Sequence, residues 1–162
     1  MLFRSVMREY EAGRIGGTIY GPVSKLITME SNVVTAIETA LGANLQNIVV
    51  QNEATAKAAI GALKTAKAGR ATFYPLDSIV YGGETEEIRR CARMAGYVGR
   101  ADKLISYQNS FKNVMEWLLG RTVIFDTLDH ASVAARETGY KVRLVTLDGQ
   151  VINAGEIGRA HV

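Results

Sequence analysis

The chain has few of the residues from which most catalytic and metal centres are built. Among its 162 residues, cysteine occurs once, as Cys91, and histidine twice, as His130 and His161. A single cysteine excludes a disulfide within the chain and a zinc site made of several thiolates. Cys91 falls on an apolar helical face, which favours buried packing. His130 follows Asp129 at a predicted helix start, where local capping is the expected role, and His161 lies among the last residues.

Several sequence motifs of nucleotide and hydrolase sites are also missing. There is no Gly-x-x-x-x-Gly-Lys-Ser/Thr loop, no Gly-x-Gly-x-x-Gly after a strand, no His-Glu-x-x-His and no Gly-x-Ser-x-Gly. We therefore expect no catalytic residue, no cofactor and no bound metal. No apolar run approaches the ~18 residues of a membrane span, and charges interrupt residues 1–10, so we expect a cytoplasmic protein without a membrane partner.

Charge offers a weaker indication. The formal net charge is +3 and no run of five like charges occurs, which permits sequence-independent contact with DNA without requiring it. A basic, partly aromatic middle supplies candidate phosphate contacts, with tyrosines that could stack on unpaired bases. A solvated helix face and core tyrosines explain the same pattern. The candidate contacts are Arg89, Arg90, Arg93, Arg100 and Lys103.

Hydrophobic periodicity predicts alternating helices and strands. Residues 2–10 form a short amphipathic helix that cannot be stable alone. Ser31 is expected to cap the next helix and Gly42 to end it. A strand at 45–50, a helix from Glu53 ended by Gly69, a strand at 71–76 and a helix capped by Thr85 follow.

The pattern then starts again, which predicts an internal duplication. Both copies end a helix in Leu-Gly and a strand in Leu-Asp. Asp77 and Asp148 close the equivalent strands, where acid–base chemistry is one interpretation and a copied structural turn is the favoured one. The paired segments are 36–42 with 114–120, 48–50 with 123–125, 53–67 with 129–138, and 71–77 with 141–148.

These segments together resemble the hinge domain of structural maintenance of chromosomes (SMC) proteins over residues 20–155. The resemblance rests on the series Gly21-Pro22-Val23, the first Leu-Gly, Gly69-Arg70-Ala71-Thr72-Phe73-Tyr74-Pro75-Leu76-Asp77, the second Leu-Gly and Val145-Thr146-Leu147-Asp148-Gly149. It implies a prokaryotic condensin-type hinge with a mixed α/β (α+β) fold. Two related subdomains would each form a small sheet with packed helices, preceded by a coiled-coil remnant.

The resemblance also implies a function and a division of the chain. SMC hinges join two chains as dimers, so a second hinge, in a homodimer, is the expected partner for chromosome condensation and segregation. Weak DNA contact and a cytoplasmic, chromosome-associated location are implied with it, while ATPase activity belongs to head domains elsewhere. By position, the interface strand comprises Val151, Ile152, Asn153 and Gly155. The implied ranges are 1–16 for the end of a coiled-coil arm, 17–104 for subdomain I with a basic connector, 105–156 for subdomain II, and 157–162 for a tail.

The sequence after Gly155 departs from the family, which usually continues with further glycines. Whether the tail 157–162 is native is left open, and loss of those glycines would weaken close approach of two backbones. Two other hypotheses remain. One is a small-molecule-binding α/β domain, regulatory or enzymatic, with a ligand between its halves and Asp77 or Asp148 in the pocket. The other is a monomeric nucleic-acid-binding module.

Overall fold

The computed structural model describes residues 2–154 and 156–159, and contacts divide the chain into two compact units. The first unit comprises Met1–Ile27 and Ala43–Val80, and the second comprises Thr28–Gly42 and Tyr81–Val162. Each unit is therefore discontinuous in sequence. This division by contact differs from a boundary between residues 104 and 105, because residues 28–42 and 81–104 pack with the later elements. Gly155 and His161 lie outside the described residues.

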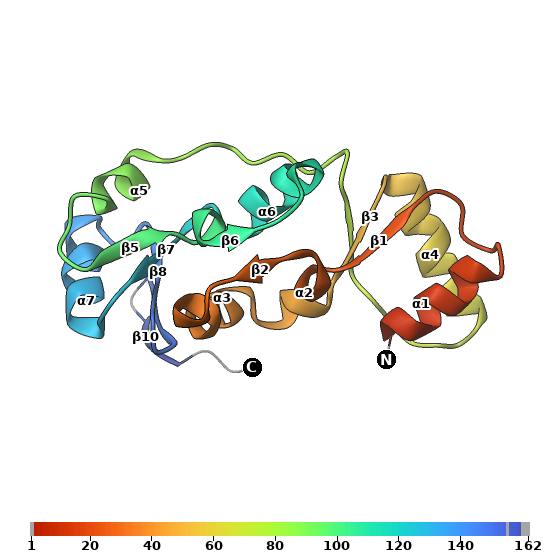
Figure 1. Ribbon diagram of the computed structural model, residues 1–162, viewed down its shortest axis with the longest axis horizontal. Helices are drawn as coiled ribbons and strands as arrows, with labels where there is room; N and C mark the ends of the chain where they lie inside the picture. The colour runs from red at the N-terminus through yellow and green to blue at the C-terminus, as the bar shows by residue number, and fades with distance from the viewer. Residues whose placement is uncertain (1, 155, 160–162) are drawn as a thin grey trace. The chain divides into compact units, whose positions relative to one another are not determined.

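The first unit is built on a three-stranded sheet in the order β1-β3-β4, of which Figure 1 labels β1 and β3. The strands are β1 (Ile19–Pro22), β3 (Ile48–Val50) and β4 (Phe73–Pro75). β3 runs antiparallel to β1 and parallel to β4. Parallel neighbours need a crossover connection, and a helix supplies it here. The helical elements are α1 (Leu2–Glu11), α2 (Val23–Leu26), α4 (Glu53–Thr65) and the 3-10 turn η2 (Gly42–Gln46), which begins at the boundary of the units.

Small side chains bring α4 close to this sheet. Ala59 and Leu63 are buried in one cluster with Ile48 and Val50 of β3. Val6 of α1 is fully buried in the same cluster, and α1 packs against α4. Burying a valine side chain is worth about 1.5–3 kcal/mol, so packing stabilises a helix that is too short to persist by itself.

The second unit contains a five-stranded sheet in the order β10-β9-β8-β7-β5 and a separate pair, β2 with β6. β7 and β8 are parallel, and the other neighbours are antiparallel. The strands are β2 (Thr28–Met29), β5 (Tyr97–Arg100), β6 (Ile105–Ser106), β7 (Thr122–Phe125), β8 (Arg143–Thr146), β9 (Gln150–Asn153) and β10 (Glu156–Arg159). The helical elements are α3 (Val34–Leu41), α5 (Glu86–Cys91), α6 (Lys112–Leu119), α7 (Leu128–Glu137), and the 3-10 turns η1 (Ser31–Val33), η3 (Ala101–Leu104) and η4 (Asn109–Phe111).

The core of the second unit lies between its sheet and helices α5 and α7. Phe125 and Leu144 are fully buried with Ala131 and Ala134 of α7. Cys91 is also fully buried there, and desolvation raises the pKa of its thiol to about 11. The predicted packing role of this cysteine is confirmed. Within residues 2–154 and 156–159, no helix has the length and apolar character that crossing a bilayer requires.

The mixed α/β fold and the internal duplication are both confirmed. The order β1-α2-β2-η1-α3-η2-β3-α4-β4 recurs as β5-η3-β6-η4-α6-β7-α7-β8, in which only η2 has no counterpart. In both copies an antiparallel strand with a register shift borders a parallel pair. β2 and β6 occupy equivalent places in the two repeats, and they pair with each other, Thr28 facing Ser106.

The predicted helix ends were partly right. Gly42 ends α3 with a φ of +54°, and the Thr85 hydroxyl accepts a hydrogen bond from the Ile88 amide at the start of α5. The prediction for Ser31 was wrong, because this residue opens the turn η1 and makes no side-chain cap. The end of α4 at Gly69 was also misplaced: the helix stops at Thr65, and Lys67 takes the left-handed conformation with a φ of +52°.

Candidate functional site

The outer edges of the two parallel strand pairs differ. β8 is covered by β9, in the register Leu144 with Ile152 and Val145 with Val151. β4, the equivalent strand of the first unit, is the last strand of its sheet, and no strand in the described part of the chain pairs with its outer side. Unpaired strand edges present rows of N–H and C=O groups that pair readily with another strand. The edge of β4 (Phe73–Pro75) is therefore a candidate site for strand addition.

The residues expected at the interface lie on β9. Val151 and Ile152 are buried, and Ile152 packs in the core of the second unit. Asn153 is exposed. On its outer side β9 pairs with β10, in the register Ile157 with Ile152 and Gly158 with Val151. Interface contact by β9 would thus use its backbone edge rather than its two apolar side chains, and β10 covers that edge here.

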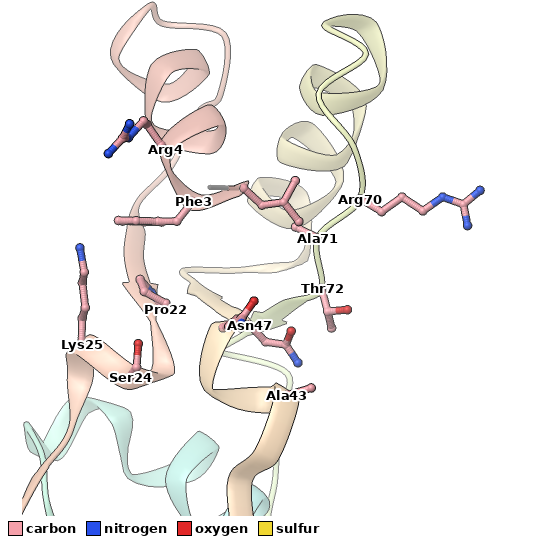
Figure 2. A pocket seen from close by; sticks show the side chains of 12 residues that line it. Phe3, Arg4, Pro22, Ser24, Lys25, Ala43, Asn47, Arg70, Ala71 and Thr72 are labelled. Carbon is pink, nitrogen blue, oxygen red and sulfur yellow. The ribbon is translucent and has the colours of Figure 1, made fainter. Parts of the chain in front are cut away.

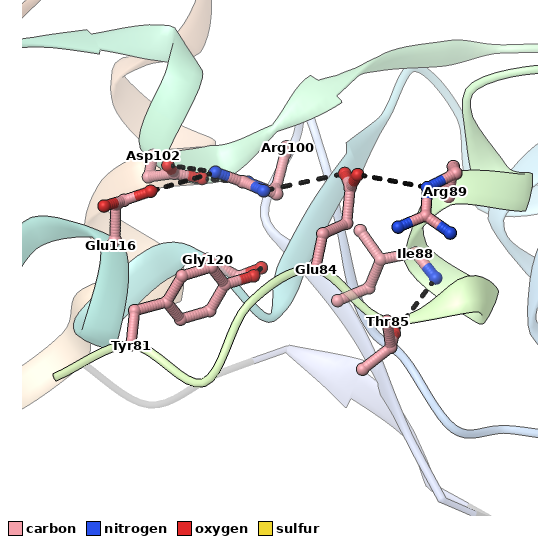
Figure 3. A network of polar contacts seen from close by, with 9 residues as sticks. All are labelled: Tyr81, Glu84, Thr85, Ile88, Arg89, Arg100, Asp102, Glu116 and Gly120. Carbon is pink, nitrogen blue, oxygen red and sulfur yellow. Dashed lines mark hydrogen bonds and ion pairs between the residues drawn. The ribbon is translucent and has the colours of Figure 1, made fainter.

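Arg100 lies in a cluster of carboxylates within the second unit (Figure 3). Its guanidinium donates to both carboxylate oxygens of Asp102, at 2.5 and 2.7 Å. Glu84 and Glu116 approach the guanidinium at 3.5 and 3.6 Å. The hydrogen bonds to Asp102 raise the pKa of Arg100 further above its ordinary value. With only 8% of the residue exposed, Arg100 stabilises the fold and does not belong to an exposed DNA-contacting set.

The same cluster holds the segment that enters the second unit after Val80. The Tyr81 hydroxyl donates to the Gly120 carbonyl at 2.7 Å, and the Arg100 guanidinium lies 5.3 Å from the centre of the Tyr81 ring. Burial raises the pKa of this tyrosine. Glu84 links Arg100 to Arg89, whose Nε lies 3.7 Å away. Figure 3 shows Tyr81 and Glu84 meeting Arg100 from one segment. Sequence reasoning missed this arrangement.

The other four basic candidates are exposed but only partly available. Arg89 pairs with Glu86 at 2.7 Å as well as with Glu84. Arg90 donates to the backbone carbonyl of Glu137 at 2.7 Å. Arg93 and Lys103 are exposed. Since Glu84, Glu86 and Glu87 neighbour the α5 arginines in sequence, the charge along this segment is nearly balanced.

The excess positive charge lies in the first unit. Its residues include eight Lys or Arg and four Asp or Glu, a formal +4, whereas the second unit has eleven and twelve, a formal −1. A cavity of about 690 Å³ in the first unit has Arg4, Lys25 and Arg70 in its wall and no carboxylate among its lining residues. Figure 2 shows Arg4 and Lys25 on one side of it and Arg70 projecting outward on the other. The sequence contains these charges, but the difference in net charge between the two units becomes visible only when residues are assigned to the units by their contacts.

The two aspartates that close the repeats make local contacts. Asp77 accepts a hydrogen bond from the Ser78 hydroxyl at 3.2 Å. Asp148 accepts one from the Thr146 hydroxyl, which in turn accepts from the Gln150 amide. These contacts order the turns after β4 and β8, and neither aspartate lines the cavity above. His130 contacts Asp126 at 2.7 Å at the start of α7. Among the described residues no group of three or more metal-ligating side chains occurs.

Comparisons with known proteins agree with this architecture. A family model described as "SMC proteins Flexible Hinge Domain" matches residues 16–135. The chromosome partition protein Smc of Desulfitobacterium hafniense is 38% identical over 139 residues, which is 86% of this chain and 12% of that protein. The chain therefore spans about an eighth of the length of such relatives.

Solved structures are similar over nearly the whole chain. An asymmetric dimer of the Geobacillus stearothermophilus SMC hinge domain matches with a TM-score of 0.87 and 36% identity, covering 98% of this chain and 65% of that one. A Pyrococcus furiosus Smc hinge domain with an extended coiled coil matches with a TM-score of 0.79 and 32% identity, covering 98% and 54%.

Proposed function

This chain belongs to the family of SMC flexible hinge domains, and from that premise we propose that it joins two SMC chains by dimerising. The expected partner is a second copy, since a bacterial hinge to which the chain is similar forms a dimer. The larger process would be chromosome partition, the role named for its bacterial relative. The function is structural rather than catalytic, and the setting that follows from it is the chromosome in the cytoplasm.

The observation that carries the proposal is that the outer edge of β8 is paired whereas, within the described chain, the outer edge of its equivalent, β4, is open. β8 has an antiparallel neighbour on its outer side and β4 has none among the described residues. A sheet edge left open in one repeat and covered in the other provides a place for a strand of a second molecule. We propose that β4 of one chain accepts the outer edge of β9 from its partner, so that Val151, Ile152, Asn153 and Gly155 contribute backbone to the junction.

The C-terminal segment bears on this pairing. β10 (Glu156–Arg159) forms a hairpin with β9 and covers the edge that the partner would use. The sequence after Gly155 departs from the family, so we propose that residues 156–162 are not needed for dimerisation. Ending the chain after Gly155 should leave the fold intact and expose the edge of β9.

The first helix is proposed to be the end of a coiled-coil arm. α1 (Leu2–Glu11) packs against α4 through Val6, and the similar hinge from Pyrococcus furiosus carries an extended coiled coil. Residues 1–16 would then belong to the arm. We propose that the two subdomains of the family correspond to residues 17–104 and 105–156. The second compact unit then takes residues 28–42 and 81–104 from the first of these ranges.

Auxiliary contact with DNA is a second proposed role, and the charge distribution favours the first unit for it. Arg4, Lys25 and Arg70 surround a cavity without an acidic side chain. Of the residues predicted from sequence, Arg93 and Lys103 are exposed, while Arg89 and Arg90 are engaged with neighbours. Gel shifts over a series of salt concentrations would compare variants in which the charges of one set or the other are reversed. Removing a phosphate contact makes the DNA affinity less dependent on salt concentration, so the set that contacts DNA is the one whose reversal has this effect.

The decisive test of dimerisation is the solution mass over a wide dilution range, by light scattering after gel filtration. We expect a mass near twice 17.6 kDa. Thr72→Lys places a charge at the start of the β4 edge, where Thr72 is exposed, and should weaken the dimer about tenfold because edge lysines oppose strand addition. Thr65→Lys, an exposed threonine at the end of α4, is the matched control. A dimer equally resistant to both substitutions would contradict pairing through β4.

A further inference from the structure

The turns that follow β4 and β8 begin in the same way. Each continues the parallel ladder by one further hydrogen bond and then closes a tight turn onto the last residue of its strand. The ladder bonds run from Leu76 N to Val50 O (2.9 Å) and from Leu147 N to Phe125 O (3.0 Å), and the turn bonds run from Ser78 N to Pro75 O (3.2 Å) and from Gly149 N to Thr146 O (3.0 Å). Up to this residue the two repeats have the same backbone plan.

The paths separate at Ser78 and its counterpart Gly149. Gly149 has a φ of +87°, a left-handed conformation that costs glycine little, and the chain then returns along β8 as β9. Ser78 is not among the residues with positive φ. Without the left-handed residue the first repeat does not turn back, and residues 79–85 continue as an irregular connector.

The connector nevertheless has the sequence of a strand at the position that corresponds to β9. When Ser78 is matched with Gly149, Val80 falls on Val151 and Tyr81 on Ile152. Isoleucine, valine and tyrosine at 79–81 are all residues that favour strands. Val80 is 73% exposed, although valine in β9 is buried at the equivalent place. Val80 therefore gains little from burial where it lies, while Ile79 and Tyr81 are half-buried.

Contacts within the second unit hold the connector in this position. Tyr81 is fixed by its hydrogen bond to Gly120 and by the Arg100 guanidinium beside its ring. Glu84 is fixed by Arg100 at 3.5 Å and by Arg89 at 3.7 Å. These contacts of Tyr81 and Glu84 with Arg100, Arg89 and Gly120 form a latch.

We infer that residues 79–82 are an alternative edge strand for β4, kept away from it by the latch. On release they would fold back as β9 does on β8, with Tyr81 opposite Phe73 and Val80 opposite Tyr74. The returned strand would occupy the edge that a second copy uses, so it would act as a built-in competitor of dimerisation. This regulatory role rests on the proposed pairing through β4, whereas the strand return itself does not.

The test combines weakening of the latch with freedom to turn. Glu84→Gln removes the carboxylate that Arg100 and Arg89 hold, and Ser78→Gly permits the left-handed residue. A non-glycine residue in that conformation is disfavoured about tenfold or more. Hydrogen exchange followed by mass spectrometry on the double variant should give amides in 79–82 that exchange at least about tenfold more slowly than in the parent chain. The dissociation constant of the dimer should be higher in the double variant than in the parent chain.

Ser78→Ala with Glu84→Gln is the matched control. It loses the same serine hydroxyl and the same carboxylate but retains the penalty for positive φ, so 79–82 should exchange as fast as in the parent or faster. Equal exchange rates at 79–82 in the glycine and alanine variants would overturn the inference. If the parent is monomeric at every dilution, pairing through β4 fails as a function, and slowed exchange in the glycine variant would still establish the alternative strand.

Discussion

Where the first repeat has Pro22 at the end of β1, the second has Arg100 at the end of β5. The two residues are equivalent by register, Pro22 facing Ile48 of β3 and Arg100 facing Val123 of β7. Proline fixes its backbone and needs no donor partner at a sheet edge. Arginine at the same place gathers Asp102, Glu84 and Glu116 around one guanidinium. One backbone position thus serves as a rigid edge in one copy and as an ion-pair centre in the other.

At the residues that precede α4 and α7, the backbone contacts of the two repeats also agree while the side-chain contacts differ. Gln51 donates its backbone N–H to the Thr18 carbonyl, and Asp126 donates its own to the Gly96 carbonyl, both at 2.9 Å. The side chains then differ: Gln51 accepts from the Thr18 amide, whereas Asp126 contacts His130 and accepts from an amide of its own turn. Duplication has preserved the main-chain ladder while the side chains around it have diverged, which separates what the fold requires from what each copy has added.

The largest expected effect comes from removing the ion-pair centre. Arg100→Met should lower the free energy of unfolding of the second unit by about 3–5 kcal/mol, because it leaves the buried Asp102 carboxylate without its partner. Urea unfolding followed by fluorescence of Trp117, the single tryptophan, reports on this unit. Arg89→Gln at an exposed ion pair is the control and should change the value by less than about 1 kcal/mol. Similar losses in both variants would mean that the cluster is not a structural centre.

A second test uses a glycine from each repeat. Gly17 and Gly96 both have a φ of +84°, and an added Cβ would collide with Thr55 in the first case and with Asp126 and His130 in the second. We expect Gly96→Ala to destabilise by about 2–3 kcal/mol, and more than Gly17→Ala, because several atoms must move rather than one hydroxyl. Gly83→Ala, with a φ of +96° and open space around it, isolates the backbone cost. Thermal unfolding of the three variants gives the order, and a Gly83→Ala loss as large as that of Gly96→Ala would contradict crowding.

The smallest expected effect concerns acid. The hydrogen bond from His130 lowers the pKa of Asp126 below 3.8, and a carboxylate with a lowered folded-state pKa adds stability that is present above its unfolded pKa and lost as pH falls through the folded value. The loss therefore falls below about pH 4. Asp126→Gln introduces the residue that the first repeat has at this position, Gln51. In this variant the urea midpoint should depend less on pH below about pH 4. A parent and variant that lose stability in parallel from pH 4 downward would exclude this contribution.

Much of the fold could be predicted from local sequence patterns, because each repeat contains residue pairs that mark the ends of its helices and strands. Leu-Gly at the end of a helix and Leu-Asp at the end of a strand indicated two copies of a helix–strand–helix–strand series, and the order of these elements was right. The parallel pairing of the strands was not predicted. β5 (Tyr97–Arg100) was not predicted, since Gly96 just before it and Gly99 within it weaken the pattern of a four-residue strand. The assignment of residues 28–42 to the second unit was also missed, because it depends on contacts such as the short pairing of β2 with β6, two strands that lie far apart in the sequence.

The candidate site was less accessible from sequence. Arg100 was grouped with exposed arginines because charge alone does not reveal burial, and the carboxylates that surround it come from positions 84, 102 and 116. Only Asp102, two residues away, was a local indication. Open and covered strand edges are likewise properties of the assembled sheet. The interface residues on β9 stay a prediction, as does the DNA-contacting set.

The pairing of β2 with β6 has a consequence for the history of the molecule. Thr28 faces Ser106, its own counterpart in the other repeat, so in this ladder the duplicated halves meet through the same position. A strand that pairs with its own copy is what two identical subunits form about a two-fold axis. Fusion of two such genes would leave that ladder inside one polypeptide and free the remaining positions to drift. The two repeats would then descend from two identical subunits that became a single chain.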